Sequence, residues 1–497
     1  MNKRRLLIIF ISLFILFRIL LPVRSGQFSQ DEALFALRAN QILHCVPHPE
    51  QMFVGEGDKN IFIQQIPPCG KLPLKGLFGG LGVSHGPYPT YWLTLLYFLT
   101  SFHFSLVFLF ASICFIGASY LIAQSMRLKS SSFLWRSIFL LSLTSPLMVS
   151  FTNVALLDTS WLIVLSALCI YISMQMWKKE WLRYLFLGCL NGLAIGSHIQ
   201  SLPFIIGFSV WLYLKTKKKK WMIPFLLGFI LLGGPYLLML LLSVNKILAY
   251  SHPFLKSNAW FDIFLNIGVF TRFIGAHPFF IVNKSNVILS RIELSLAVIS
   301  IFTQVTLFIG VVYLYVRKRK LEQAIHPLYS LSFYIILAYA PIVLLSGIGR
   351  AVHETMIIWW SGPVLASFVM YYFSKKWREI ILSLFVIFQL LIVGIEYLPR
   401  LHYGTSVYDM HESSYWIYEN VVKKICLSTN RQSILVSLDK TLPYRERLSL
   451  ILPSMIAIRY PDCVSRVRFT YEKKADMAIR PDEKGRRLEV VVRKSTN

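Results

Sequence analysis

Long apolar segments dominate this sequence. They run for about 16 to 24 residues with few charges, and a helix of about 20 residues crosses the roughly 30 Å hydrocarbon layer of a membrane. The chain is 55% hydrophobic and only 15% charged, which separates it from ordinary soluble proteins. The segments therefore predict an integral membrane protein, and they exclude a secreted domain, a coiled coil and a disordered tail.

Basic residues form six short clusters between the apolar segments. The chain has 51 Lys and Arg against 24 Asp and Glu, a net charge of +27, which on a soluble protein would indicate nucleic-acid binding. Short basic loops beside membrane helices instead face the cytoplasm, so we expect no nucleic-acid partner. The clusters are Lys3 to Arg5, Arg127 with Lys129 and Arg136, Lys178 and Lys179 with Arg183, Lys215 with Lys217 to Lys220, Arg317 to Lys320, and Lys375 and Lys376 with Arg378.

If all six clusters are cytoplasmic, an odd number of crossings must separate each outer loop from the next cluster. This condition predicts about eleven transmembrane helices, a cytoplasmic N-terminus and an extracytoplasmic C-terminus. The aromatic stretch 88–101 is too short to cross and is expected at the outer interface. A cleaved signal peptide is an alternative for residues 1–23. The predicted spans are 6–23, 103–125, 133–152, 160–177, 181–197, 200–214, 221–242, 292–316, 328–348, 356–373 and 379–397.

The predicted fold is an all-α polytopic membrane module with a small C-terminal α/β domain. Residues 1–397 form the module, and residues 24–102 are its first outer loop. Residues 398–497 have 18 basic and 11 acidic side chains, and they combine strand-like runs at 433–438 and 488–492 with a helical run at 414–425. About 100 residues can bury a small core, and we expect this domain outside the cytoplasm.

Acidic residues are sparse before the C-terminal domain, so those near a membrane face carry information. Only 13 occur in the first 398 positions. Asp31 and Glu32 follow the first crossing, and Asp158 lies between the third and fourth. Ser29 with Glu32 also fits a helix capping box, and Asp158 fits a helix N-cap. Because both acidic positions are predicted on the outer face, one carboxylate could accept a proton while another orients an acceptor or a metal.

A segment rich in glycine and proline follows, from residue 65 to 92. Such a backbone is irregular, and near a membrane it is tolerated where protein covers it or where it lines a cavity. Lys71 and His85 are candidate ligands for a phosphate at the interface. Contact of Lys71 with lipid headgroups is the alternative.

Three motifs together resemble a known family. They are QDEALFALRANQIL after the first helix, the glycine-rich segment ending in GPYPTYW, and SFTNVALLDTSWLIVLSALCIYI. In this order they resemble the dolichyl-phosphate-mannose protein mannosyltransferase-like family of GT-C glycosyltransferases, which includes aminoarabinose transferases of lipid A. The resemblance covers roughly residues 1–215, and the remaining helices agree by topology alone.

The resemblance implies an inverting glycosyltransferase of the cell envelope. It implies a polyprenyl-phosphate-linked sugar as donor and a glycolipid, glycan or protein as acceptor, on the outer face of what we expect to be a bacterial plasma membrane. By the same resemblance Asp31 is the general base, Glu32 is its partner, and Asp158 helps to place the acceptor or the base. Phosphate is already a good leaving group, so a base and a cation are the main requirements.

The sequence departs from the family where many relatives carry a lysine after the fifth helix. Here the chain reads Gly-Ser-His-Ile-Gln, so either His198 replaces that phosphate contact or the contact is absent. Arg350 and His353 form another candidate phosphate site, with an ordinary loop salt bridge as the alternative.

Four cysteines, Cys45, Cys69, Cys426 and Cys463, are predicted outside the cytoplasm. An oxidising compartment allows the pairs 45–69 and 426–463, one of three connectivities. The residues from His44 to Glu50 include possible metal ligands but lack the spacing of a strong zinc motif. Some GT-C enzymes use a divalent cation, and the sequence does not decide whether this chain does.

Two other functions fit parts of the pattern. A transporter or flippase of a lipid-linked glycan would also have many crossings and basic outer residues, although transporters commonly show internal repeats and polar midplanes that this sequence lacks. A structural membrane subunit with a basic tail would leave the shared outer position of Asp31 and Asp158 to chance. A lipid-linked-sugar glycosyltransferase is the leading hypothesis.

Overall fold

The fold is known from a computed structural model of the whole chain. The structure describes residues 3–46 apart from 27 and 29, 66–73, 86–100, 103–153 apart from 131, 160–242 apart from 217 and 218, 326–346, 359–403, 414–428, 433–439, 445–470, 475–481 and 488–492, with isolated positions between them.

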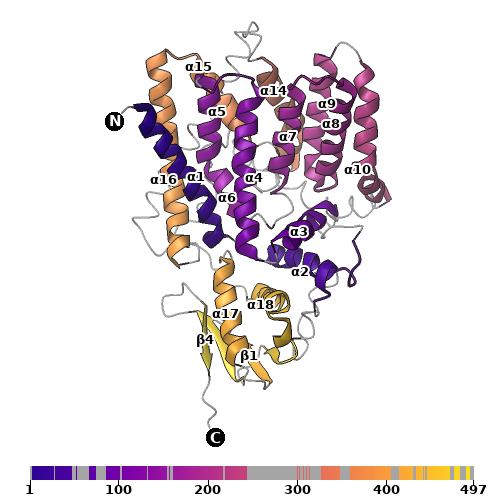
Figure 1. The fold of residues 1–497 in the computed structure, drawn as a ribbon, viewed down its shortest axis with the longest axis vertical. Coiled ribbons are helices and arrows are strands. Elements are labelled where there is room, and N and C mark those ends of the chain that lie inside the picture. The colour runs from indigo at the N-terminus through magenta and orange to yellow at the C-terminus, as the bar shows by residue number, and fades with distance from the viewer. Residues whose placement is uncertain are drawn as a thin grey trace.

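The described part of the chain is a bundle of long helices with a smaller unit at one end (Figure 1). In the bundle, helices occupy the predicted spans except 292–316, where only isolated helical positions are described. The count of eleven crossings stays a prediction. The helices are α1 (Lys3–Ser25), α4 (Phe104–Ser125), α5 (Phe133–Thr144), α6 (Pro146–Asn153), α7 (Leu162–Met174), α8 (Glu180–Ile195), α9 (Leu202–Lys215), α10 (Met222–Leu242), α14 (His326–Ser346), α15 (Ser361–Tyr371) and α16 (Lys375–Tyr403). The predicted boundary at 397 falls inside α16.

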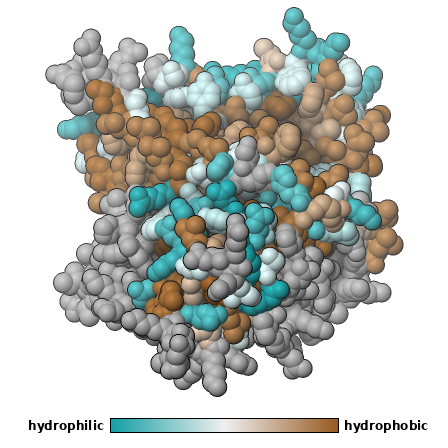
Figure 2. All heavy atoms as spheres, turned by 60° about the horizontal axis from the view of Figure 1, so that its bottom comes forward, coloured by the Kyte–Doolittle hydropathy of each residue, from teal (hydrophilic) through white to brown (hydrophobic). Residues whose placement is uncertain are grey.

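Three described helical segments are long and apolar enough to cross a membrane: Phe104–Ser125, Met222–Leu242 and Lys375–Ile395. Each has 21 or 22 residues and therefore spans about 32 Å. Helices α8 and α9 are shorter, with 16 and 14 residues, as their short predicted spans indicated. Figure 2 shows an apolar band across the molecule below a hydrophilic upper rim. The chain is an integral membrane protein.

One end of the bundle gathers basic residues. Arg136 near the start of α5 pairs with Glu379 near the start of α16 at 2.7 Å, which joins two of the clusters. Arg183 at the start of α8 donates to the carbonyl of Gln175 after α7 at 3.0 Å. The N-terminus lies at this end, and the C-terminal unit lies at the opposite end (Figure 1). The basic clusters and the C-terminal unit are predicted on opposite faces of the membrane, and their positions at opposite ends of the bundle agree with that prediction (Figure 1).

The predicted span 133–152 is not a single helix. The structure divides it at Ser145, whose ψ of 121° leaves the helical region, and α6 then begins at Pro146. Proline has no N–H and disfavours helical backbone in the preceding residue, so it ends one helix and starts the next. The carbonyl of Leu141 beside the break accepts a hydrogen bond from Nε2 of Gln389 in α16 at 3.4 Å.

Two helices lie across the end of the bundle that faces the C-terminal unit (Figure 1). They are α2 (Gln30–His44) and α3 (Tyr88–Leu99), which pack against each other. α3 buries Leu93 and Leu96 and leaves Leu95 and Phe98 exposed. A short helix with an exposed apolar side suits the membrane interface, where residues 88–101 were predicted.

Helices α8 and α10 pack closely through glycines. An ideal Cβ on Gly188 would lie 2.0 Å from the carbonyl oxygen of Phe225, and one on Gly228 would lie 2.3 Å from that of Leu185. Small residues of this kind let helix backbones approach closely inside membranes. The two helices therefore form one rigid pair.

The C-terminal unit, from α17 to β4, is a small α/β structure. Its four strands have the order β2-β1-β3-β4, with β1 parallel to β2 and β3, and β3 antiparallel to β4. The predicted helix and the two predicted strands correspond to α17, β1 and β4. The elements are α17 (Tyr415–Ser428), β1 (Ile434–Leu438), α18 (Arg445–Arg459), β2 (Val467–Thr470), β3 (Met477–Pro481) and β4 (Leu488–Val492).

Both disulfides allowed by the sequence are present. Cys45 pairs with Cys69, and Cys426 of α17 pairs with Cys463 after α18. The second bond closes a loop with a sequence separation of 37 and joins α17 to the turn that follows α18 in the C-terminal unit.

We expect Cys426→Ser with Cys463→Ser to lower the unfolding free energy of this unit by about 2 to 4 kcal/mol, because the unfolded chain regains loop entropy. Protease protection of the unit across a urea series measures the change. Cys114→Ser, which removes a free thiol of α4, is the control. Equal protection in all three proteins would contradict the expectation.

Candidate functional site

Helix α2 carries the first acidic pair to the end of the bundle. Asp31 is the second residue of α2, and nothing is described of its side chain. Glu32 is buried, with 1% of its surface exposed. A carboxylate so far from solvent requires polar or charged partners, and Glu32 has interactions within the protein. Ser29, the other half of the proposed capping box, lies outside the described residues.

A set of buried hydrogen bonds joins α1 to α6 near this end of the bundle. Arg18 of α1 is 2% exposed, and it donates to the carbonyl oxygen of Met148 at 3.3 Å and to Oγ1 of Thr152 at 3.2 Å. Ser25 at the end of α1 donates to Oδ1 of Asn153 at the end of α6. These bonds fix the residues from which the α6–α7 connection departs.

The α6–α7 connection carries the second acidic position. Asp158 lies outside the described residues, but its neighbours Leu156, Ser160 and Trp161 are buried. Trp161 lies edge-on to Trp92 of α3 with ring centroids 5.1 Å apart, and 5.6 Å from Phe115 of α4.

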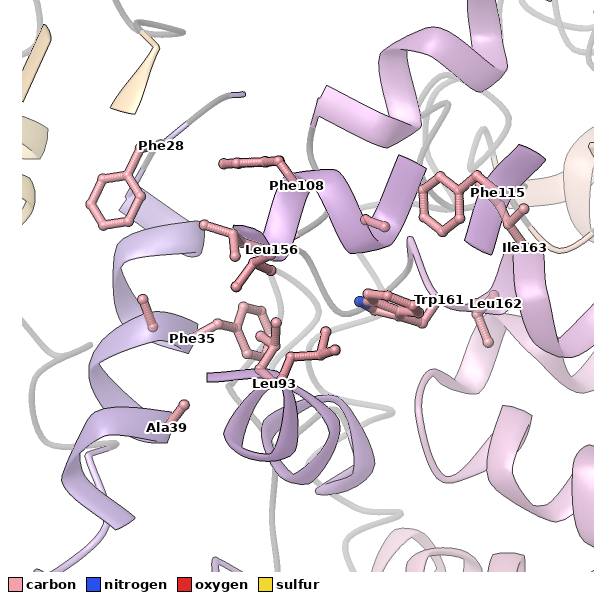
Figure 3. Packing of buried hydrophobic residues seen from close by; sticks show 14 of the residues in the cluster. Phe28, Phe35, Ala39, Leu93, Phe108, Phe115, Leu156, Trp161, Leu162 and Ile163 are labelled. Atoms are coloured by element: carbon pink, nitrogen blue, oxygen red, sulfur yellow. The ribbon is translucent and has the colours of Figure 1, made fainter. Parts of the chain in front are cut away.

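Figure 3 shows Leu156 and Trp161 near the apolar side chains of α2, α3 and α4. The α6–α7 connection therefore packs, through Leu156, near the helix that carries Asp31 (Figure 3). Helix α7 begins at Leu162 with Trp161 as its N-cap residue, so Asp158 is not the N-cap that the alternative interpretation required.

The glycine- and proline-rich segment is tied to α2 and α3. Gly70, with a φ of +67°, donates to the carbonyl of Gln41 at 3.3 Å, next to the Cys45–Cys69 disulfide. The phenol of Tyr91 donates to the carbonyl of Pro73 at 2.6 Å. Lys71 between these contacts is exposed. The backbone around Lys71 is therefore tied to α2 and α3, while its exposed side chain is open to a ligand or to lipid headgroups.

Arg38 is a buried cation that sequence reasoning left without a role. It lies two helical turns after Asp31 in α2 and is 2% exposed. Burial lowers its pKa to about 10, and the electrostatic interaction with Tyr91 opposes this shift. Arg38 therefore remains charged at neutral pH. Two features of the sequence indicated buried cations. Arg38 follows Asp31 by seven residues in one helix, and Arg18 lies inside an apolar span.

The other end of the glycine-rich segment meets the turn after α8. Gly86 donates to the carbonyl of Ser197 at 3.4 Å, and an ideal Cβ on Gly86 would lie 1.5 Å from the carbonyl oxygen of Gly196. His198, the next residue in the turn, is 4% exposed and has partners in the protein. The contact brings the segment that contains His85 to the turn of His198.

The remaining predicted ligands lie outside the described residues. His85, Arg350 and His353 are in this group, and so are His48 and Glu50 of the possible metal motif. Cys45 of that motif is held in a disulfide and cannot act as a thiolate ligand. Within the described ranges, no three His, Cys, Asp or Glu residues are grouped in a way that could hold a metal ion.

Comparison with known proteins identifies the fold. No family model and no curated protein matches this sequence. The crystal structure of ArnT from Cupriavidus metallidurans bound to undecaprenyl phosphate is similar over 100% of this chain and 99% of ArnT, with a TM-score of 0.53 and 10% identity. The chain has a GT-C-like fold. The resemblance inferred from the three motifs is therefore confirmed at the level of the fold. The structural similarity covers the whole chain, and so it includes the helices after residue 215.

Proposed function

We propose that this chain is a membrane glycosyltransferase that acts with a polyprenyl-phosphate carrier. It moves a sugar from the carrier to a glycolipid, glycan or protein acceptor on the outer face of a bacterial plasma membrane, with inversion of the anomeric centre. The observation that carries the proposal is the GT-C-like fold over the full chain, shared with an ArnT structure that contains undecaprenyl phosphate.

The arrangement at the end of the bundle supports the same chemistry. Asp31 and Glu32 are the second and third residues of α2. Leu156, in the α6–α7 connection that contains Asp158, packs near apolar side chains of α2 and α3 (Figure 3). In the proposed reaction Asp31 accepts the proton of the acceptor hydroxyl as that oxygen attacks the anomeric carbon. Glu32 supports this base, and Asp158 orients the acceptor. The polyprenyl phosphate leaves with the electrons of the broken glycosidic bond.

Cations near the leaving phosphate would complete the site. We propose Lys71, His85, His198, Arg350 and His353 as candidate phosphate contacts. Lys71 is the exposed member of this group that the structure describes, held between the contacts of Gly70 and Pro73. A divalent cation could serve the same purpose, and dialysis against a chelator tests for one.

We expect Lys71→Gln to raise the KM for the lipid-linked donor about threefold to tenfold with little change in kcat. An exposed cation attracts phosphate through a largely screened interaction, so the effect should shrink as salt rises. Donor titrations at low and high ionic strength measure it, with Lys423→Gln on the exposed side of α17 as control. An equal KM in both variants would assign Lys71 to lipid headgroups.

The function itself is tested with purified protein in lipid. A panel of polyprenyl-phosphate monosaccharides is supplied with an acceptor extract, and released polyprenyl phosphate is measured by mass spectrometry. Release from one donor, with the sugar recovered on an acceptor, is the expected result and names the sugar. If no donor is consumed but a lipid-linked glycan crosses the bilayer of proteoliposomes, the protein is a flippase.

A further inference from the structure

The turn between α1 and α2 packs directly on helix α4. An ideal Cβ on Gly26 would lie 2.5 Å from the ring of Phe108, so glycine alone fits there without a shift. The N–H of Gly26 donates to the carbonyl of Pro22 at 2.8 Å. Phe108 of α4 therefore packs against this turn on the side of the bundle. Gly26 lies five residues before Asp31 in the sequence.

Tyr415 closes the same turn from the C-terminal unit. Its backbone N–H donates to the carbonyl of Gly26 at 3.0 Å, and its phenol donates to the carbonyl of Val23 at 2.9 Å. Its ring stacks on Phe108 with centroids 5.8 Å apart and planes 22° apart. Carbonyls in the last turn of a helix lack partners within that helix, so one residue satisfies two acceptors at the end of α1. Burial raises the pKa of Tyr415, which keeps the donating proton in place.

The rest of the C-terminal unit holds Tyr415 rigidly. Arg459 of α18 pairs with Glu419 of α17 at 2.9 Å, and the second disulfide joins α17 to the turn after α18. α18 in turn packs along α2. Phe28, between Gly26 and α2, lies 5.1 Å from Phe104 and 6.5 Å from Tyr418 by ring centroids.

We infer that Tyr415 is a positioning residue for the transfer reaction. It fixes Val23 and Gly26, and these fix where α2 begins and hence where Asp31 and Glu32 lie at the end of the bundle. The inference rests on the proposed function, in which these carboxylates act on the acceptor. A displacement of about 1 Å between a base and its substrate is enough to slow a reaction strongly.

The test is Tyr415→Phe, which removes the hydrogen bonds of the phenol with the Val23 carbonyl and the Ser105 side chain and keeps the backbone bond and the stacked ring. Tyr460→Phe after α18 removes a hydroxyl from the same unit and is the matched control. We expect kcat to fall about threefold to tenfold in Tyr415→Phe, with the donor KM unchanged, as loss of the hydrogen bonds of the buried phenol would allow. Hydrogen–deuterium exchange over residues 26–44 should rise in this variant and not in the control.

The two readouts separate the inference from the proposed function. Faster exchange over 26–44 in a protein whose wild type transfers no sugar would overturn the function and leave the positioning contact in place. Unchanged exchange, or a kcat equal to that of the Tyr460→Phe control, would overturn the positioning role. A parallel loss of kcat and thermal stability in both variants would also overturn it, because general destabilisation would then explain the result.

Discussion

Asp31→Asn is expected to reduce sugar transfer by at least about a hundredfold. An amide has nearly the shape of a carboxylate but cannot accept the proton of an acceptor hydroxyl, and general-base catalysis typically contributes about 10² to 10⁴ in rate. Asp31 lies in the first turn of α2 at the end of the bundle, next in sequence to the buried Glu32. The rate of polyprenyl phosphate release at saturating donor and acceptor measures the loss.

The matched control is Asp462→Asn, which makes the same change at an exposed position of the C-terminal unit. It should transfer at the wild-type rate. Donor KM in Asp31→Asn should stay within about twofold, because a base on the acceptor adds little to binding of the donor. An Asp31→Asn protein that elutes like wild type and keeps full activity would remove Asp31 from the reaction.

Gly188→Leu is expected to prevent most of the protein from folding. The Cβ that it introduces would lie 2.0 Å from the carbonyl oxygen of Phe225, so α8 and α10 would have to separate. Overpacking of a fixed interface costs about 3 kcal/mol or more where backbone must move, and the glycines of this pair face each other on both helices. Monodisperse yield after detergent extraction and the midpoint of thermal aggregation measure the effect.

Gly117→Leu is the control for this variant. Gly117 lies within α4, and an ideal Cβ there meets no atom within 4 Å. Because leucine has a higher helix propensity than glycine by up to about 1 kcal/mol, this variant should match wild type or exceed its thermal midpoint. Equal losses in both variants would mean that the closeness of α8 and α10 is not the cause.

Local patterns predicted much of the fold. The predicted boundaries of α4 and α10 agree with the structure within one or two residues. A membrane-spanning helix must be as long as the hydrocarbon layer is thick, so the length of an apolar segment indicates where such a helix begins and ends. Short strand-like apolar runs located β1 and β4. The break at Ser145 was not predicted, although Pro146 is a helix-breaking residue. The apolar residues continue on both sides of Pro146, so the pattern predicts one span over the whole stretch.

The site was predicted less completely. The motifs indicated Asp31, Glu32 and Asp158, and the structure adds that the α6–α7 connection packs near α2 (Figure 3). Arg18 and Arg38 were missed because both were read as ordinary members of a membrane helix or a motif. Their burial depends on neighbours that are far away in sequence, such as Thr152 for Arg18.

The sequence by itself determined the membrane class, most of the helices that the structure describes and the separation of the six basic clusters from the C-terminal unit, because these follow from the spacing of residue types along one segment. The tertiary structure decided which segments meet. Tyr415 reaches Val23 across 392 positions, and Gly188 meets Phe225 on another helix. Such contacts depend on the paths of several helices at once, and no local pattern encodes them.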